Sequence, residues 1–582
     1  MLNIKFIREI IMRLKGLGLF LTAVISACLL VIPGDISASA YDGTHINADL
    51  NASRKPDHIT LTWLEDPATT MTITWRTDAS VKSCSVEYVS LESDSDKMSM
   101  ISTLHPTVFS TSSTDTISGK MHIFSTTLTG LKPGAKYIYK IGNDKNEWTN
   151  FHVFATESND EKSSNRFKFL LFGDSQSGKE EVPSYDNWHT TAQNAFRANK
   201  DAKFFINVGD LVETGQYYQH WNNWFKAVDG VIDTLPALVV EGNHETYNGT
   251  NGKHTRPEYF VNQFNLFRNG PDRLKGQVYS YEYGKCHFAV LDSQAQEESE
   301  DREGKADPVK EEAFLKEQAA WLDKDLAAHK NAAFTFVLFH KTPYYNKGNR
   351  TNTLIKNVFC PVFDKYHVDV VFNGHDHATS RTYPIYRDEL MQNPSEGTVY
   401  YVTGRSGEKY YPDLTKKVWD AAFFDPQDQP DYQTVELDGR KLTIKCFKQD
   451  GTLVDTYVID KDHPEINTSA GELLPPKFHT AKDNPVIGAD LKLVVYGNYA
   501  AGSSSKAEEI SGKIYVDILS IASASEGSYD AVAKTLTIKE KKIQFKDDML
   551  DSKGSMVSID ALAGLGFSCR YDVKFAMVFV EK

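Results

Sequence analysis

The sequence predicts a multidomain chain in which an all-β block, an α/β block and a small α+β block follow one another along 582 residues. Residues 57–156 hold short alternating apolar runs separated by turn residues, which is typical of a β-sandwich. Residues 165–455 alternate apolar strands with helical stretches, which indicates an α/β fold. Beyond a proline-marked boundary, residues 480–582 combine strand-like runs with one helix-like stretch. The length agrees with three or four domains of about 150 residues each.

Composition limits the classes of function. Hydrophobic residues make up 41% and aromatic residues 12% of the chain, so a disordered protein is excluded. The formal net charge of −14 disfavours a nucleic-acid binder, which would need a basic surface, and we expect no nucleic-acid partner. Six cysteines are too few for a disulfide scaffold of this length, and we expect most of them to be small buried core residues.

The first forty residues have the order of a targeting segment. A basic stretch precedes the apolar run Leu17–Ile32, a Pro-Gly pair ends it, and Ala38-Ser39-Ala40 supplies a small-x-small cleavage signature. We predict a signal peptide at residues 1–40 that is cleaved after Ala40, a lead at 41–56, and therefore a secreted, extracellular or cell-surface protein. The alternatives are an uncleaved membrane anchor, or lipidation of Cys28, whose surroundings resemble a bacterial lipobox.

Five motifs at the ends of predicted strands carry metal-ligand side chains. The carboxyl ends of strands are where open α/β sheets build their sites, and the glycine that opens most of the motifs permits a tight turn and a close backbone approach. In order, the motifs are Gly173-Asp174-Ser175-Gln176, Gly209-Asp210-Leu211-Val212-Glu213, Gly242-Asn243-His244-Glu245, Leu338-Phe339-His340-Lys341 and Gly374-His375-Asp376-His377.

Together these motifs predict a centre for two divalent metal ions. Two ions about 3.5–4 Å apart can clamp a phosphoryl group if one carboxylate bridges them and further ligands surround both. Oxygen combined with imidazole nitrogen suits Fe, Mn or Zn. Each motif alone has an ordinary structural explanation, such as a turn, whereas five in this order favour a metal site. The six expected ligands are Asp174, Asp210, Asn243, His340, His375 and His377.

The motif set resembles the calcineurin-like metallophosphoesterase superfamily, and in particular its purple acid phosphatase branch. Residues 57–156 are similar to the fibronectin type III-like N-terminal domain of that branch. The resemblance implies that residues 165–455 form a ββ sandwich of two mixed sheets flanked by helices, with the site at the strand ends. Segments between the motifs are also similar to the family, namely Tyr279–Gly284, His287–Leu291, Gln318–Leu322 and Arg381–Pro384.

The resemblance also implies a role for each expected ligand. Asp210 would be the carboxylate that bridges both metals. The first metal would also be held by Asp174 and His377. The second metal would also be held by Asn243, His340 and His375.

Two further residues are candidates for contact with the substrate. His244 would stabilise phosphate charge or protonate the leaving oxygen, and the alternative is that it orients its neighbours. Arg350 lies where the family carries extra substrate-facing histidines past the position of His340. It would grip a phosphate oxygen, and the alternative is a solvated loop arginine.

The first metal departs from the family pattern. Purple acid phosphatases place a tyrosine three residues after the bridging aspartate, where this chain has Glu213. The wider superfamily places a histidine two residues after the first aspartate, where this chain has Gln176. We expect Gln176, Glu213 or water to complete that site. We also expect a protein that is not purple, with Mn, Zn or Fe(II) favoured over Fe(III).

These observations predict a secreted phosphatase that hydrolyses phosphate monoesters by in-line attack of a metal-bound hydroxide. A phosphodiesterase or nucleotide-directed enzyme is an alternative, because loops 246–278 and 293–312 would decide how the leaving group is accommodated. A wall-associated binding protein with a degenerate metal site is another. The segment around Met556–Cys569 resembles the stalk-like amine-oxidase N-terminal module of secreted Gram-positive proteins, which suggests a C-terminal contact with the cell wall.

Overall fold

The computed structural model describes residues 52–464 and 492–581 with short gaps. The predicted signal peptide, its cleavage site and Cys28 lie outside the described residues. Among the described helices, none combines the length and the apolar character needed to cross a bilayer. The gaps are 93–97, 104–106, 111–119, 161–164, 182, 249–253, 301–303, 348–349, 351, 501–505, 511–512, 539–540 and 573–576.

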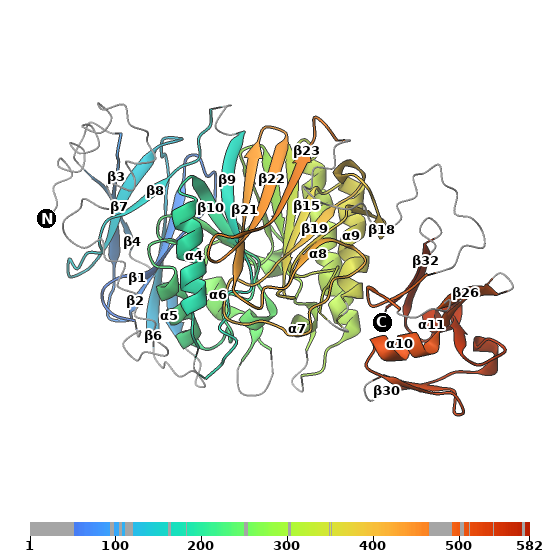
Figure 1. The fold of residues 1–582 in the computed structure, drawn as a ribbon. Coiled ribbons are helices and arrows are strands. Elements are labelled where there is room, and N and C mark those ends of the chain that lie inside the picture. Colours follow the sequence, from blue (N-terminus) through green and yellow to red (C-terminus); the bar gives the residue numbers. More distant parts are fainter. Residues whose placement is uncertain are drawn as a thin grey trace.

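The N-terminal block is a β-sandwich of two antiparallel four-stranded sheets, which confirms the predicted all-β block (Figure 1). Trp75 and Phe124 face each other across two strands of the first sheet, and their rings stack in the core with centroids 5.8 Å apart. The first sheet has the order β1 (Asp57–Thr62), β2 (Met71–Asp78), β6 (Lys120–Leu128) and β5 (Thr107–Ser110). The second has the order β4 (Ser99–Thr103), β3 (Cys84–Ser90), β7 (Lys136–Asn143) and β8 (His152–Ala155).

The central block contains two mixed sheets, which confirms the predicted α/β architecture. Strands β9 to β11 are parallel in the first sheet, as are β13, β14, β15 and β19 in the second. The first has the order β11 (Ala237–Val239), β10 (Ala202–Asn207), β9 (Arg166–Phe172), β21 (Asp431–Asp438), β22 (Lys441–Lys448) and β23 (Leu453–Asp460). The second has the order β12 (Tyr279–Tyr283), β13 (Cys286–Val290), β14 (Phe334–Lys341), β15 (Val370–Gly374), β19 (Val399–Thr403), β16 (Thr379–Thr382) and β20 (Asp420–Phe424).

Strand β14 shows why the two sheets stack. Successive side chains of a strand point to opposite faces, so a strand that is apolar throughout packs on both sides. Phe336 points into the core between the sheets, where its ring centroid lies 6.1 Å from that of Phe169 on the first sheet. Phe339 points the other way and packs on Phe359 of a covering helix, with centroids 5.6 Å apart.

Helices cover the central sheets on their outer sides (Figure 1). The longest begins after Asp307, whose side chain accepts a hydrogen bond from Val309 N at 3.0 Å, with Pro308 in the first turn. The longer helices are α4 (Asp186–Ala198), α5 (Tyr218–Ala227), α8 (Pro308–Ala328) and α9 (Thr353–Tyr366). The shorter elements are η2 (Asn243–Thr246), α6 (Glu258–Gln263), η3 (Asp272–Leu274), α7 (Ala295–Ser299), η4 (Pro394–Glu396), and the hairpin β17 (Ile385–Tyr386) and β18 (Glu389–Leu390).

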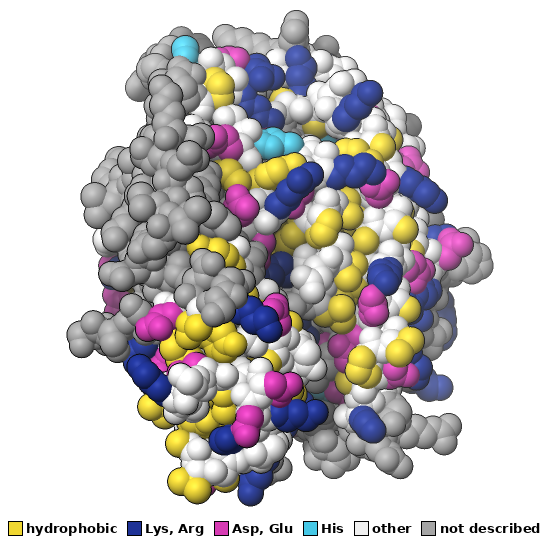
Figure 2. Space-filling view, turned by 90° about the vertical axis from the view of Figure 1, so that its right-hand side faces the viewer, with side chains coloured by type: hydrophobic (Ala, Val, Ile, Leu, Met, Phe, Trp, Pro, Cys, Tyr) yellow, Lys and Arg dark blue, Asp and Glu magenta, His cyan; other side chains and the backbone are white. Residues whose placement is uncertain are grey.

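The C-terminal block is a small α+β module, as predicted. Its described residues form three short sheets and two helices, whereas the sequence indicated one helix. Figure 2 views the molecule from this end and shows positive and negative side chains interspersed over that face. The helices are α10 (Ile518–Ala524) and α11 (Ile559–Gly564). The strands are β24 (Lys492–Val495), β25 (Asn498–Tyr499), β26 (Ala507–Ile510), β27 (Lys513–Asp517), β28 (Ser528–Asp530), β29 (Thr535–Ile538), β30 (Lys541–Gln544), β31 (Met556–Ser558), β32 (Ser568–Asp572) and β33 (Met577–Glu581), with η5 (Asp547–Met549) between β30 and β31.

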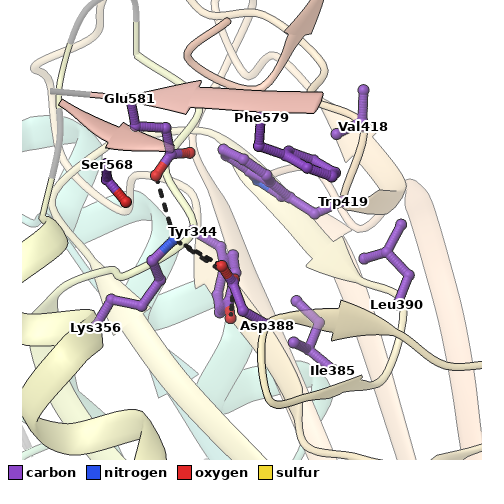
Figure 3. Close-up of a pocket in the computed structure, with 10 residues that line it drawn as sticks. All are labelled: Tyr344, Lys356, Ile385, Asp388, Leu390, Val418, Trp419, Ser568, Phe579 and Glu581. Atoms are coloured by element: carbon purple, nitrogen blue, oxygen red, sulfur yellow. Dashed lines mark hydrogen bonds and ion pairs between the residues drawn. The ribbon is translucent and has the colours of Figure 1, made fainter. Parts of the chain in front are cut away.

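The module packs on the central block through β33 and the loop before β20. Lys356 Nζ on α9 lies 3.2 Å from Glu581 of β33 and 3.2 Å from Asp388 of the β17–β18 hairpin, and Figure 3 shows the amine between the two carboxylates. Val418 N donates to Gly497 O at 2.9 Å. A small pocket beside this ion triad is lined by residues of both blocks. The module is therefore held against the central block by an ion triad and a backbone hydrogen bond.

The cysteines follow the expectation from composition. Among the residues that the structure describes, the five cysteines are all free thiols. Cys84, Cys286, Cys360 and Cys446 are buried in strands or in α9, and Cys569 is half-buried. They therefore act as small core side chains rather than as cross-links.

Candidate metal centre

The predicted ligands meet at the carboxyl ends of strands from both central sheets. Asp174 follows β9 and Asp210 follows β10, and Asn243 opens η2 after β11, so the first sheet supplies three of them. His340 lies near the end of β14 and His375 directly follows β15 in the second sheet. Because the two sheets stack, their strand ends place these side chains against one another.

The ligand atoms form two groups that share one carboxylate. In the first group, atoms of Asp174, Asp210 and His377 all lie within 4.8 Å of one another, with His377 Nε2 3.2 Å from Asp174 Oδ1. In the second group, atoms of Asp210, His340 and His375 lie within the same distance. His340 Nε2 is 3.1 Å from Asp210 Oδ2, and His375 Nδ1 is 3.2 Å from His340 Nε2. The arrangement suits two ions bridged by Asp210.

Backbone carbonyls orient two of the imidazoles. His340 Nδ1 lies 2.9 Å from Val208 O, and His377 Nδ1 lies 2.9 Å from Lys409 O. A ring nitrogen that donates to a carbonyl carries a proton, so in the neutral, metal-binding form of the imidazole the other nitrogen presents a lone pair. In both residues this leaves Nε2 pointing at the carboxylates of the centre.

Two orphaned oxygens test whether the residues fit a metal centre. Asn243 Oδ1 and Gln176 Oε1 are buried and have no hydrogen-bond partner among the described residues. The amide nitrogen of Asn243 donates to Tyr247 Oη at 2.8 Å, so the oxygen is the atom left over. Gln176 Nε2 lies 3.2 Å from Asp210 Oδ2 and 3.3 Å from His377 Nε2, so this amide borders the first group, and a half-turn of the amide would present Oε1 to a cation there. Buried polar atoms are nearly always paired, and a cation would supply the missing partner. The residues therefore fit two divalent ions.

The backbone is strained at four of the predicted ligands. Asp174, Asp210, His375 and His377 have φ of 50°, 52°, 75° and 59°, a left-handed conformation that costs energy for residues other than glycine. His375 N donates to both carboxylate oxygens of Asp174, at 2.9 and 3.0 Å, and so fixes one strained residue against another. Strain of this kind persists where the surroundings hold it in place, which is typical of functional sites.

Glu245 holds the loops together, and the sequence analysis did not single it out. Its carboxylate accepts hydrogen bonds from Asp210 N at 3.0 Å, Leu211 N at 2.9 Å and Gly242 N at 2.7 Å. A Cβ at Gly242 would collide with the backbone nitrogen of Asp210, so glycine is required for this approach. The signal was a glutamate three residues after Gly242, the position from which its carboxylate can reach back to the backbone N–H that precedes a helix.

The buried charges depend strongly on one another. Burial alone would raise the pKa of Asp210, but His340 and His244 outweigh it and hold that pKa well below its usual range. Burial would likewise lower the pKa of His340, but the adjacent Asp210 carboxylate raises it to about 9. Burial, together with the charge of Arg350, lowers the pKa of His375 well below 6.5. Without metal, Asp210 is thus paired with a protonated His340, and a cation has to displace that proton.

Glu213 is engaged by a lysine that the sequence analysis missed. Lys409 Nζ lies 3.1 Å from Glu213 Oε1, and Gly178 N donates to Glu213 Oε2 at 2.9 Å. Both carboxylate oxygens are therefore used, and Glu213 belongs to neither ligand group. Lys409 lies two residues beyond the Gly-rich segment Gly404-Arg405-Ser406-Gly407, which directly follows β19. That glycine-rich strand end was the signal that could have found it.

His244 lies between Glu213 and Lys409, beside Asp210. Its Nδ1 contacts Glu213 O, and its Nε2 lies 2.8 Å from Lys409 Nζ. Its backbone N–H donates to Asp210 Oδ1 at 2.9 Å. Burial, followed by the charge of Lys409, lowers the pKa of His244. The pair therefore consists of a neutral imidazole that accepts a hydrogen bond from an ammonium group.

Arg350 supports the loop that carries His375. Its Nη1 donates to His375 O at 2.9 Å and pairs with Asp376 Oδ1, and its guanidinium lies 5.8 Å from the ring centroid of Tyr411. The side chain is 18% exposed, so the solvated loop arginine considered above is wrong. Contact with a phosphate oxygen remains a prediction, which would use the guanidinium nitrogens beyond Nη1.

Family models match the N-terminal block and most of the central block. Residues 56–156 match the purple acid phosphatase N-terminal domain, and residues 167–379 match the calcineurin-like phosphoesterase domain. The solved structure of purple acid phosphatase PPD1 from yellow lupin (Lupinus luteus) seeds shares this fold, with a TM-score of 0.56 at 17% identity over 74% of this chain and 78% of that one.

Curated relatives carry two kinds of name. The chain is 23% identical to probable inactive purple acid phosphatase 27 of Arabidopsis thaliana, over 59% of this chain and 59% of that protein. It is 24% identical to purple acid phosphatase 15 of the same plant, over 48% of this chain and 53% of that protein. The chain thus spans between about half and three fifths of these relatives. The resemblance inferred from the motifs is confirmed: the chain combines a purple acid phosphatase N-terminal domain with a calcineurin-like phosphoesterase domain.

Proposed function

We propose that this protein is a dinuclear-metal phosphatase that hydrolyses phosphate monoesters. The observation that carries the proposal is the pair of ligand groups that share Asp210, together with the unpartnered amide oxygens of Asn243 and Gln176. Bound Fe, Mn or Zn ions would polarise the phosphoryl group and lower the pKa of a water molecule. The first ion would be held by Asp174, Asp210, His377 and Gln176, and the second by Asp210, Asn243, His340 and His375.

Lys409 and His244 would act on the substrate as one unit. Burial opposes a charge on Lys409, yet the adjacent Glu213 carboxylate raises the pKa of this lysine, so the proton of the pair lies on Lys409. Its Nζ lies 2.8 Å from His244 Nε2, and Glu213 O holds the opposite ring nitrogen. The ammonium group would bind a phosphoryl oxygen and protonate the basic leaving oxygen, while His244 orients it.

The fixed positive charge favours monoesters over diesters. A monoester at neutral pH carries up to two negative charges on its phosphoryl group, and a diester carries one. An ammonium group in a buried site gains more from the greater charge. The alternative of a phosphodiesterase rests on loops 246–278 and 293–312, which would have to leave room for a second ester group.

The test of this function is a comparison of two chromogenic substrates. The purified chain, loaded with Mn, Zn or Fe(II), is assayed with p-nitrophenyl phosphate and with bis(p-nitrophenyl) phosphate, together with its metal content. We expect about two metals per chain and a clear preference for the monoester. A preference for the diester would replace the monoester proposal with the phosphodiesterase.

A metal-binding protein without turnover is the second candidate. Glu213 is held by Lys409, so the first metal has Gln176 as its third side chain, and a neutral amide is a weaker ligand than the histidine of the superfamily. A relative named as probably inactive agrees with this alternative. It predicts one metal or none per chain and hydrolysis of neither substrate after reconstitution.

We further propose that the chain is exported and that its C-terminal module contacts the cell wall. The basic, apolar and small-residue order of residues 1–40 supports export. The module is seated through Lys356 and Val418 rather than through residues of the metal centre, so it can carry a separate contact. Cell fractionation of the full chain and of a chain that lacks residues 480–582 would test both points.

A further inference from the structure

A second cluster of metal-ligand side chains lies away from the candidate centre. In the part of the chain that the structure describes, ligand atoms of Glu282, His287 and His329 also lie within 4.8 Å of one another. Glu282 and His287 are direct partners in the antiparallel pair of β12 and β13, so their side chains share one face of the sheet. His329 is the residue at which α8 ends. The cluster thus joins an edge hairpin to the end of the longest helix.

A carboxylate fixes the orientation of His287. His287 Nε2 lies 2.7 Å from Asp325 Oδ2, and Ser280 Oγ donates to Asp325 Oδ1 at 2.7 Å. Because Asp325 accepts at both oxygens, the proton of the imidazole lies on Nε2, and Nδ1 presents a lone pair. This carboxylate–histidine arrangement is the one that orients histidine ligands in metal sites.

The second ring nitrogen of His287, Nδ1, is buried and has no hydrogen-bond partner among the described residues. The side chain is 1% exposed. An imidazole nitrogen enclosed in this way would ordinarily bind a protein donor or a water molecule. The alternative is that His287 only anchors α8 through Asp325. That role accounts for the hydrogen bond of Nε2 but gives no reason for a buried Nδ1 without a partner.

His329 can complete the site by turning its ring. Its Nδ1 now lies 2.8 Å from Asp325 O, a hydrogen bond that the ring gives up when it turns toward an ion. The rings of His287 and His329 are stacked, with centroids 4.0 Å apart and planes 11° apart, so a single ion cannot lie in both ring planes as they stand. The His329 side chain is 31% exposed at a helix end, so part of the ring borders solvent, into which it can turn.

We propose that Glu282, His287 and His329 bind a zinc ion, separate from the dinuclear centre. Two imidazole nitrogens and one carboxylate oxygen are a known zinc ligand set, with water in the fourth position. The ion would tie the β12–β13 hairpin to the end of α8. Binding to the folded chain alone makes the ion stabilising. The site is independent of the proposed phosphatase activity.

The test is a zinc count on four full-length chains dialysed against buffered zinc. The parent is compared with His329→Ala, with Glu282→Gln, and with His189→Ala as a matched control, because His189 Nδ1 also contacts a helix carbonyl, Ala227 O at 2.8 Å. We expect both cluster variants to carry one zinc fewer per chain than the parent, and the control to match it. Both cluster residues are at least partly exposed, so folding is preserved.

The difference between parent and variant separates this site from the phosphatase proposal. If the phosphatase proposal fails and the dinuclear centre binds no metal, the parent should still carry one zinc and His329→Ala none, and the inference stands. Zinc should also raise the melting temperature of an Asp210→Asn chain, and less so when His329→Ala is added. Equal zinc content in parent, His329→Ala and Glu282→Gln would overturn the proposal.

Discussion

The two halves of the candidate metal centre share Asp210 but differ in the rest of their ligands. The second half offers two imidazoles, of His340 and His375, and the orphaned oxygen of Asn243. The first half offers one imidazole, a carboxylate and the amide of Gln176. Glu213, which could have strengthened the first half, is bound to Lys409 instead. The comparison teaches that a Glu213–Lys409 ion pair occupies the position where the family resemblance implies a metal ligand.

Substitution of the shared ligand should have the largest effect. Asp210→Asn removes the charge that both halves use, so we expect the two halves together to hold less than one ion and kcat to fall on the order of 10³-fold or more. Metal analysis and monoester turnover measure both effects. Asp369→Asn is a matched control, because this buried carboxylate pairs with Lys461 at 2.8 Å. It precedes β15, at the end of the strand opposite to His375. Full activity in the Asp210→Asn chain would show that the geometry has been misinterpreted.

Changes at Gln176 should alter the first half alone. Gln176→His supplies the imidazole that the wider superfamily uses, and should tighten the first metal by about 10- to 100-fold. Gln176→Ala should release it and leave the second metal bound. Titration of chelator-treated chains with Mn or Zn counts the sites and their affinities. If all three chains bound two ions equally, Gln176 would have no part in the centre.

The parts of this site that could be predicted are those that depend on strand ends. Asp174 and Asp210 follow β9 and β10, which are parallel neighbours in one sheet, so their carboxyl ends lie at the same edge. His375 follows β15 of the other sheet, and a polar motif at the end of its strand marks it in the same way. The same holds for the fold, because Phe336 and Phe339 mark a strand that is apolar on both faces. Local pattern decides these features.

The parts that could not be predicted depend on partners far apart in the chain. Glu213 and Lys409 are 196 positions apart, and the local sequence around either residue does not indicate that the two form an ion pair. Arg350 was expected to meet solvent or phosphate because Asp376, which neutralises it, belongs to another motif. Such charge pairs follow from the tertiary fold, and they decide which side chains of the five motifs remain free to bind metal or substrate.

Lys409 should matter for the substrate and not for the metals. Lys409→Met removes the ammonium group beside His244, and the loss of a charged hydrogen bond of about 1.5–3 kcal/mol predicts a fall of about 10- to 100-fold in kcat/KM for a monoester. The diester should lose less. Lys409→Arg keeps the charge and should recover part of the activity. Metal content should remain that of the parent in both variants, and a parallel loss of metal would mean that Lys409 acts by releasing Glu213.

The smallest expected effect is a pH dependence that belongs to the second half. His340 must lose its proton to bind a metal, and the Asp210 carboxylate raises its pKa to about 9, so metal and proton compete below that pH. The apparent affinity should therefore rise with pH by at most about tenfold per unit and level off near pH 9. The Gln176→Ala chain, which retains the second half, should show the same slope in zinc competition experiments. A flat affinity between pH 6 and pH 8 in that chain would mean that His340 is already neutral there, and that the Asp210–His340 ion pair does not form before the metal arrives.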